Sequence, residues 1–250
     1  MLNVIKYDIL QNYRIYIIEY VVYLITCIIL PFIPQNIVFI PMFLLLLLVW
    51  AMILLNFVTI FYNFYKSMYS NKGYLTMTLP LSSHELLLGK IFAGIIWIII
   101  SFVILFLGFG LIALMFSIME NSVFEQLSFL LEALSQLVST VYFYEGILAI
   151  IIFIISFITV GFTVLTIIQT KFTRKHKAIW AIVAYVALIV INNILRYAFV
   201  KIIAIFGLYN TIGNILQITG PILPTALISL IQSTILYFVS IYVLDNMLEL

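Results

Sequence analysis

The sequence predicts an all-α integral membrane protein with six transmembrane helices. The chain has 250 residues, of which 66% are hydrophobic and 8% are charged, and its mean hydropathy is +1.30. A soluble domain carries about 25% charged residues, so the 11 basic and 9 acidic residues here are too few to cover the surface of a globule. The same composition excludes a disordered chain, which needs low hydrophobicity and high charge.

Long apolar runs place the six spans; five of them are free of charge, and the first contains only Glu19. Each helical residue adds about 1.5 Å, so about 20 apolar residues cross a hydrocarbon core of roughly 30 Å. The first run lacks a small-residue cleavage site, which favours a span over a signal peptide. The prolines between the first two runs predict a tight turn. The predicted spans lie near residues 15–33, 37–64, 91–118, 146–168, 178–195 and 222–244.

The distribution of basic residues predicts the topology, because loops on the inner side of a membrane carry an excess of Lys and Arg. With the N-terminus inside, the outer segments hold Arg196 and Lys201, and the other nine of the 11 basic residues lie inside. The loop from Met119 to Glu145 has four glutamates and no basic residue. We therefore expect a multi-pass protein of a bacterial cell membrane with both termini in the cytoplasm.

Three segments outside the spans carry patterns of their own. Residues 1–14 place Leu2, Ile5 and Ile9 at helical spacing, which predicts an interfacial helix on the inner membrane surface. Apolar residues from Phe124 to Val141 recur every three or four positions, which predicts an outer amphipathic helix. Residues 202–220 are charge-free but interrupted by glycines; they predict a re-entrant hairpin before the last span, with a seventh span as the alternative.

The connection between the second and third predicted spans, from Tyr65 to Lys90, is longer than a turn requires. The stretch after Gly73 is apolar enough for a short helix, and Pro80 ends it, because proline lacks the amide hydrogen and disfavours helix in the residue before it. Ser82 and Glu85 then have the spacing of a capping box for the next helix. The pattern predicts a small rigid module that projects into the cytoplasm. The alternative is that Lys66, Lys72 and Lys90 are only a basic anchor at the inner membrane surface.

This segment resembles the first cytoplasmic loop of ABC-2 type transporter permeases. The resemblance rests on Gly73, Leu75, Leu79, Pro80, Ser82, Leu86, Leu87, Leu88, Gly89 and Lys90. The wording GYLTMTLPLS looks most like small permease subunits of Gram-positive peptide exporters, including the phenol-soluble modulin exporters, and the six-span plan extends the resemblance over the whole chain. It implies a coupling helix that docks into a separate ATP-binding subunit through Tyr69, Lys72, Gly73, Tyr74, Leu75, Thr76, Met77, Leu79, Pro80 and Ser82.

The resemblance also implies the partners. Two copies of the ATP-binding subunit would use ATP and Mg, while a second permease subunit, as a homodimer or a heterodimer, would complete the pathway in the lipid bilayer. Nucleic acid has no expected role. The chain itself has no GxxxxGK[ST] loop, since Gly89-Lys90 is followed by Ile91. We expect no cofactor, no nucleotide site and no enzymatic activity in this chain.

Other chemistry is weakly represented. His84 and His176 are isolated from each other and from Cys27, which predicts two solvated histidines in basic inner loops rather than a metal site. Cys27 is expected to pack as a small apolar side chain. Ser101 and Ser156 have no histidine partner in any predicted span, so an intramembrane protease is not favoured. A polytopic membrane enzyme or maturation factor, and an ion-coupled transporter, remain alternatives. The latter would need several buried acids, whereas Glu19 alone lies well within a span.

Polar and aromatic side chains within the spans are candidates for a substrate pathway. Glu19 follows Arg14 by five residues and either reaches back to the interface, pairs with a cation or lines the pathway. Asn56 is predicted to form an interhelical hydrogen bond. Asn192, Asn193 and Arg196 either line an exit vestibule or cap the fifth span. The aromatic residues near the inner end of the second span form an interfacial belt or an apolar wall. The pathway candidates are Glu19, Phe57, Phe61, Tyr65, Asn192 and Arg196.

Cysteine labelling tests the topology. A reagent that does not cross the membrane should label a cysteine placed at Ser128, in the acidic outer loop, and should miss one at Lys175, in a basic inner loop. The opposite pattern of labelling would reverse the orientation and remove the argument from the basic residues.

Overall fold

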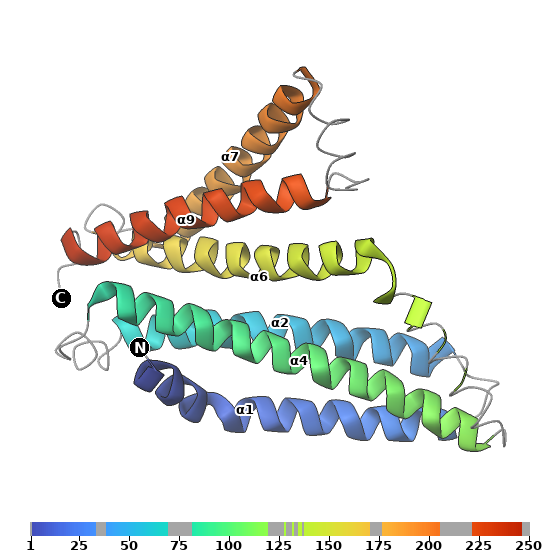
Figure 1. Ribbon diagram of the computed structural model, residues 1–250. Helices are drawn as coiled ribbons and strands as arrows, with labels where there is room; N and C mark the ends of the chain where they lie inside the picture. Colours follow the sequence, from blue (N-terminus) through green and yellow to red (C-terminus); the bar gives the residue numbers. More distant parts are fainter. Residues whose placement is uncertain are drawn as a thin grey trace. The chain divides into compact units, whose positions relative to one another are not determined.

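The computed structural model describes residues 2–33, 39–69, 82–119, 128, 132, 135, 136, 138–170, 177–205 and 222–246. The regular secondary structure of these residues is helical throughout, as predicted (Figure 1). The elements are α1 (Leu2–Ile29), the short 3-10 helix η1 (Leu30–Phe32), α2 (Phe39–Tyr69), α4 (Ser83–Met119), α6 (Val141–Ile168), α7 (Lys177–Ile205) and α9 (Ile222–Asn246).

Five helices are long and apolar enough to cross a membrane. The qualifying segments are Leu2–Phe32, Phe43–Tyr69, Ser83–Met115, Phe143–Ile168 and Ala226–Asn246. The multi-pass helical class predicted from the sequence is therefore confirmed. The fifth predicted span, 178–195, lies within α7, whose apolar segment Ile182–Leu195 is shorter than the others. A total of six spans stays a prediction.

The helices are longer than the predicted spans, because a polar or charged residue ends an apolar run without ending a helix. Helix α1 continues through residues 14 and 15, so the predicted boundary between an interfacial helix and the first span is not a break in the helix. Helix α7 extends to Ile205. The prediction that the hairpin begins at residue 202 is wrong for residues 202–205, and the remainder of that segment lies outside the described residues.

The end of the first helix has a local cause. Pro31 lies in η1, and the next residue but one, Ile33, has extended backbone angles, with φ −78° and ψ 132°. Pro34 follows in the sequence, and a residue before proline is driven out of the helical region by contact with the proline ring. The prolines therefore stop the helix where the sequence predicts a turn.

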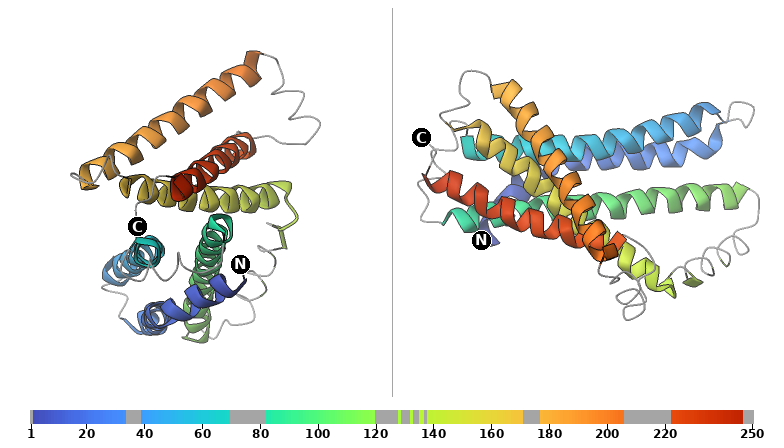
Figure 2. Two further views of the ribbon diagram at one scale, coloured as in Figure 1. Left: turned by 90° about the vertical axis from the view of Figure 1, so that its left-hand side faces the viewer. Right: turned by 90° about the horizontal axis from the view of Figure 1, so that it is seen from above.

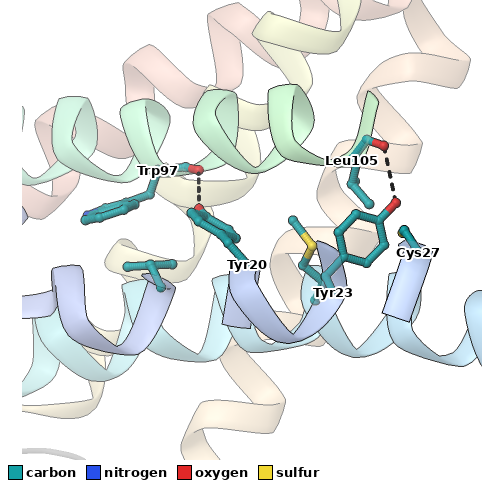
Figure 3. Packing of buried hydrophobic residues seen from close by; sticks show 7 residues of the cluster. Tyr20, Tyr23, Cys27, Trp97 and Leu105 are labelled. Carbon is teal, nitrogen blue, oxygen red and sulfur yellow. Dashed lines mark hydrogen bonds between the residues drawn. The ribbon is translucent and has the colours of Figure 1, made fainter. Parts of the chain in front are cut away.

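The chain divides into two compact units. The first unit comprises Met1–Phe64 and Leu88–Gln136, and the second comprises Tyr65–Leu87 and Leu137–Leu250. In the first unit, side chains of α1, α2 and α4 form a buried aromatic core (Figure 3). This core consists of Tyr16, Tyr20, Tyr23, Cys27, Met52, Trp97 and Leu105. Cys27 packs there as a small apolar side chain, as expected.

The second unit is organised around α6 and α9, which make the most extensive contact between helices in the described part of the chain. Their facing positions are rich in small side chains: Ala149 and Ala226 are buried together, and the hydroxyls of Ser240 and Thr163 lie 3.1 Å apart. Small residues are typical of helix contacts in membranes because they let backbones approach closely. Helix α7 contacts both helices, and its C-terminal end lies away from them (Figures 1 and 2).

A pair of glycines on α4 tests the packing of the first unit. A Cβ at Gly108 would lie 2.3 Å from Cε1 of Tyr23, whereas nothing lies within 4 Å of one at Gly110. The Tyr23 ring has little room to move, because its exposed fraction is 2% and its hydroxyl donates to the Leu105 carbonyl over 3.2 Å. Gly108→Ala should therefore lower the free energy of unfolding by about 1–3 kcal/mol.

The control is Gly110→Ala, which should be neutral or stabilising, because alanine favours a helix by about 1 kcal/mol over glycine. The measurement is unfolding in mixed micelles followed by circular dichroism. Equal stability of the two variants would mean that Tyr23 does not pack on Gly108.

Candidate functional site

The connection between α2 and α4 is the first candidate site. Most of the predicted coupling residues lie in residues 70–81, outside the described part of the chain; they are Lys72, Gly73, Tyr74, Leu75, Thr76, Met77, Leu79 and Pro80. Both flanks are described. Tyr69 is the last residue of α2, and its ring lies 6.1 Å from that of Tyr65. Ser82 immediately precedes α4.

The start of α4 has the predicted capping box. The Glu85 amide donates to Oγ of Ser82 over 3.3 Å, and the Ser82 amide donates to Oε2 of Glu85 over 3.4 Å. The Leu86 amide also donates to the Ser82 carbonyl over 3.1 Å. Two amides that would otherwise have no helical acceptor are satisfied reciprocally. The capping-box prediction is confirmed, and α4 begins with a well-defined first turn.

The first turn of α4 is also bound to α9. Oγ of Ser83 donates to Oδ1 of Asp245, and Nδ1 of His84 lies 3.1 Å from the Tyr237 hydroxyl. These four residues form what we call the α4–α9 clamp. Tyr237 and Asp245 are about two helical turns apart, so the clamp holds α9 at two levels. The carboxylate of Asp245 is also favourably placed at the N-terminal end of α4, where the helix dipole attracts negative charge.

The clamp was not predicted from the sequence. His84 was expected to be a solvated histidine in a basic loop, and it is indeed exposed, but its ring is held against Tyr237, with ring centroids 5.9 Å apart. The one indication of the clamp in the sequence was Asp245, the single acidic residue in α9. Because the two residues of each pair lie more than 150 positions apart, no local pattern identifies the partners.

The second candidate site lies in the first unit, where residues of α1 contact residues of α4 that come 81 or 82 positions later in the sequence. Nζ of Lys90 donates to both carboxylate oxygens of Asp8 over 3.1 Å, and further along, Tyr23 contacts the Leu105 carbonyl. In each pair, the two residues are 82 positions apart in the sequence. The helices are therefore parallel and in register between these pairs. The Lys90 side chain is only 3% exposed, so it is part of a buried ion pair rather than a solvated anchor.

Between these two pairs, four side chains form a hydrogen-bonded chain across α1, α2 and α4. Oγ of Ser101 lies 2.7 Å from the Tyr20 hydroxyl and 2.9 Å from Oδ1 of Asn56. Nδ2 of Asn56 donates to Oε1 of Glu19 over 3.3 Å and to the Met52 carbonyl over 2.8 Å. We call Glu19, Tyr20, Asn56 and Ser101 the polar layer. The prediction that Asn56 forms an interhelical hydrogen bond is confirmed.

The polar layer borders a stacked aromatic pair. The rings of Tyr16 and Trp97 lie 3.8 Å apart at 15°, and the Tyr20 hydroxyl reaches toward the Trp97 carbonyl (Figure 3). Three buried polar atoms here have no hydrogen-bond partner among the described residues: the Tyr16 hydroxyl, Oε2 of Glu19 and Nε1 of Trp97. Buried polar groups in proteins nearly always have a hydrogen-bond partner, so these three atoms are available to bind a polar group.

Glu19 was expected to reach the interface, to pair with a cation or to line the pathway. An amide holds one of its oxygens, and no Lys or Arg side chain in the described part of the chain forms an ion pair with it. Its role in the pathway stays a prediction. Ser101, which the sequence suggested only as an unsupported nucleophile, is a buried junction of the polar layer. The signal for this site was the spacing of Tyr16, Tyr20 and Tyr23 along one helical face.

The other pathway candidates lie on α2 and α7. Phe57 and Phe61 are half-buried on α2 in the first unit, whereas Tyr65 is exposed and belongs to the second. Asn192 and Arg196 lie within α7, which continues to Ile205. The interpretation of these two residues as a helix cap is therefore wrong, because no helix end occurs there. Their role in an exit vestibule stays a prediction.

The buried ion pair generates a stability prediction. Lys90→Met should lower the free energy of unfolding by about 1–3 kcal/mol, because it leaves the Asp8 carboxylate without its partner. Adding Asp8→Asn should restore most of the loss by removing the unpaired charge. Lys6→Met, at an exposed position of α1, is the control and should be nearly neutral. Unfolding in mixed micelles is measured for the unaltered chain, Lys90→Met, Asp8→Asn, the double variant and the control. Additive effects of the Lys90 and Asp8 substitutions would show that the two residues do not interact.

Comparison of the chain with protein-family models, curated proteins and solved structures finds no match. Among the described residues, no group of three or more His, Cys, Asp and Glu side chains is placed to hold a metal ion. The function is therefore inferred from two features of the chain itself: the capped and clamped start of α4, and the polar layer between α1, α2 and α4.

Proposed function

We propose that this chain is the transmembrane permease subunit of an ATP-driven exporter in a bacterial cell membrane. Its substrates would be amphipathic peptides or other hydrophobic compounds. The observation that carries the proposal is the start of α4, where a connection between two membrane-length helices ends in a capping box and a clamp onto α9. A segment that transmits force needs such a rigid attachment, whereas a simple charged loop does not.

The proposed mechanism assigns ATP hydrolysis to a partner. Two ATP-binding subunits would dock on the 70–81 connections of two permease subunits, here two copies of this chain. Closure of the ATP-bound partners would move the connections, and the capped first turn of α4 would transmit the displacement. Because the clamp ties that turn to Tyr237 and Asp245, α9 would move with it. The Ser240–Thr163 contact would extend the movement to α6.

This scheme is a shift between inward-facing and outward-facing populations. ATP drives it only by binding one state of the assembly more tightly than the other. In the proposed topology, six spans place both termini and the 70–81 connection in the cytoplasm, where ATP is available. A single chain with six spans would contribute half of the pathway, and its second copy the other half.

Docking is tested by the double substitution of Tyr74 and Leu75 by alanine. Interface anchors of this kind often contribute 2 kcal/mol or more, which corresponds to roughly thirtyfold in affinity. The double variant should insert normally in the membrane but lose the ATP-binding subunit during purification and lose substrate-stimulated ATP hydrolysis. Alanine at Leu195 and Tyr197, both exposed on α7, is the matched control and should retain the subunit.

A variant of the clamp distinguishes docking of the ATP-binding subunit from transmission of its movement. Ser83→Ala combined with Asp245→Asn leaves residues 70–81 intact, so the ATP-binding subunit should still copurify while substrate stimulation of its ATP hydrolysis falls. Full substrate stimulation of ATP hydrolysis in the Tyr74/Leu75 variant would mean that the connection serves only as a charged anchor at the membrane surface. Full stimulation in the clamp variant would mean that α9 is not part of the transmission.

A further inference from the structure

We propose that Glu19 and Tyr16 bind the ammonium group of an amphipathic molecule at the edge of the polar layer. That this molecule is the exported compound rests on the proposed function. Oε1 of Glu19 is occupied by the Asn56 amide, but Oε2 is buried without a hydrogen-bond partner in the described part of the chain. The hydroxyl of Tyr16, a residue with an exposed fraction of 0%, also lacks a partner among those residues.

The position of Glu19 in the bilayer makes a cation the favoured occupant. Glu19 lies five residues beyond Arg14, which places it roughly 7.5 Å further along the helix axis. An acidic side chain at such a depth is costly unless it is paired, and it commonly marks a ligand pathway. No Lys or Arg among the described residues supplies the pairing charge. A positively charged ligand would supply it.

Neighbouring side chains suit an ammonium group. Tyr16 precedes Glu19 by three residues, so both lie on nearby faces of α1. An N–H group of the ligand would donate to Oε2 of Glu19, and another would donate to the Tyr16 hydroxyl. The stacked rings of Tyr16 and Trp97 provide aromatic surface, which attracts cations through its negative face.

The site is held in place before any ligand arrives. Asn56 uses both amide hydrogens, one on Glu19 and one on the Met52 carbonyl, and its oxygen accepts from Ser101. These contacts fix the Asn56 amide and, through it, the Glu19 carboxylate. Binding to a preorganised group loses less free energy in ordering side chains.

The surface of α1 beside Glu19 selects an amphipathic ligand. Ile15 and Val22 lie four residues before and three residues after Glu19, on the same side of the helix. Their exposed fractions are 52% and 50%. An apolar chain of the ligand would lie along these two side chains while its ammonium group binds the Glu19 carboxylate. A small inorganic cation would make no use of this surface.

The test uses the fluorescence of Trp97 in the full-length chain. The sequence has three tryptophans, so Trp50→Phe and Trp180→Phe leave Trp97 as the reporter. Titration with dodecylamine in a fixed concentration of detergent should give a saturable change in emission. Dodecanol, which has the same apolar chain without the charge, should give none at the same concentrations.

Glu19→Gln should weaken dodecylamine binding at least tenfold, which corresponds to about 1.4 kcal/mol. Tyr16→Phe removes only a hydroxyl without a partner and should weaken it severalfold without loss of thermal stability. Glu132→Gln, at an exposed position outside the predicted spans, should have no effect. Size-exclusion chromatography establishes that each variant is monodisperse.

Equal affinity of the unaltered chain and Glu19→Gln, or saturable binding of dodecanol with the affinity of dodecylamine, would overturn the proposal. If Glu19→Gln aggregates, unchanged affinity in Tyr16→Phe has the same consequence. No ATP-binding subunit takes part in the titration. Failure of amine binding would therefore leave the exporter proposal standing, and loss of the ATP-binding partner would leave the ammonium site standing.

Discussion

Hydrocarbon offers no hydrogen bonds, so a polar group inside a membrane protein must find its partner within the protein. The polar layer in the first unit follows from this constraint. Asn56 has no charge and a short side chain, yet it satisfies both amide hydrogens and its oxygen on three different residues. The parallel register of α1 and α4, from the Asp8–Lys90 pair to the Tyr23–Leu105 contact, brings these groups to matching depths.

The second unit meets the same constraint with smaller groups. Buried threonines on α6 donate their hydroxyls to carbonyls of their own helix, as Thr163 does to Thr159 over 2.6 Å and Thr166 to Thr163 over 2.7 Å. Because these hydroxyls are satisfied within α6, its backbone can approach that of α9 closely. A first unit held by large aromatic side chains and a second held by small ones differ in how they tolerate substitution.

Much of the fold followed from the sequence, because apolar runs and their interruptions determine which segments can be buried in lipid. The four predicted spans near 91–118, 146–168, 178–195 and 222–244 fall within the observed helices. The first predicted span ends one residue past η1, and the second starts at residue 37, outside the described residues. The Ser82–Glu85 cap was visible as a local spacing. The ends of α1 and α7 were misplaced, since charges at Arg14 and Arg196 interrupt an apolar run without breaking a helix. The clamp and the polar layer were not predictable, because Ser83 and Asp245, or Glu19 and Asn56, meet only through tertiary packing.

The central claim is that this chain works with a separate ATP-binding subunit. The most direct measurement is affinity purification of the unaltered full-length chain from its own cells in mild detergent, followed by identification and activity measurement of what comes with it. The account predicts an ATP-binding subunit in equal amount to the permease, with ATP hydrolysis that rises when an amphipathic substrate is added. A pure, monodisperse chain without any ATP-hydrolysing partner would contradict it.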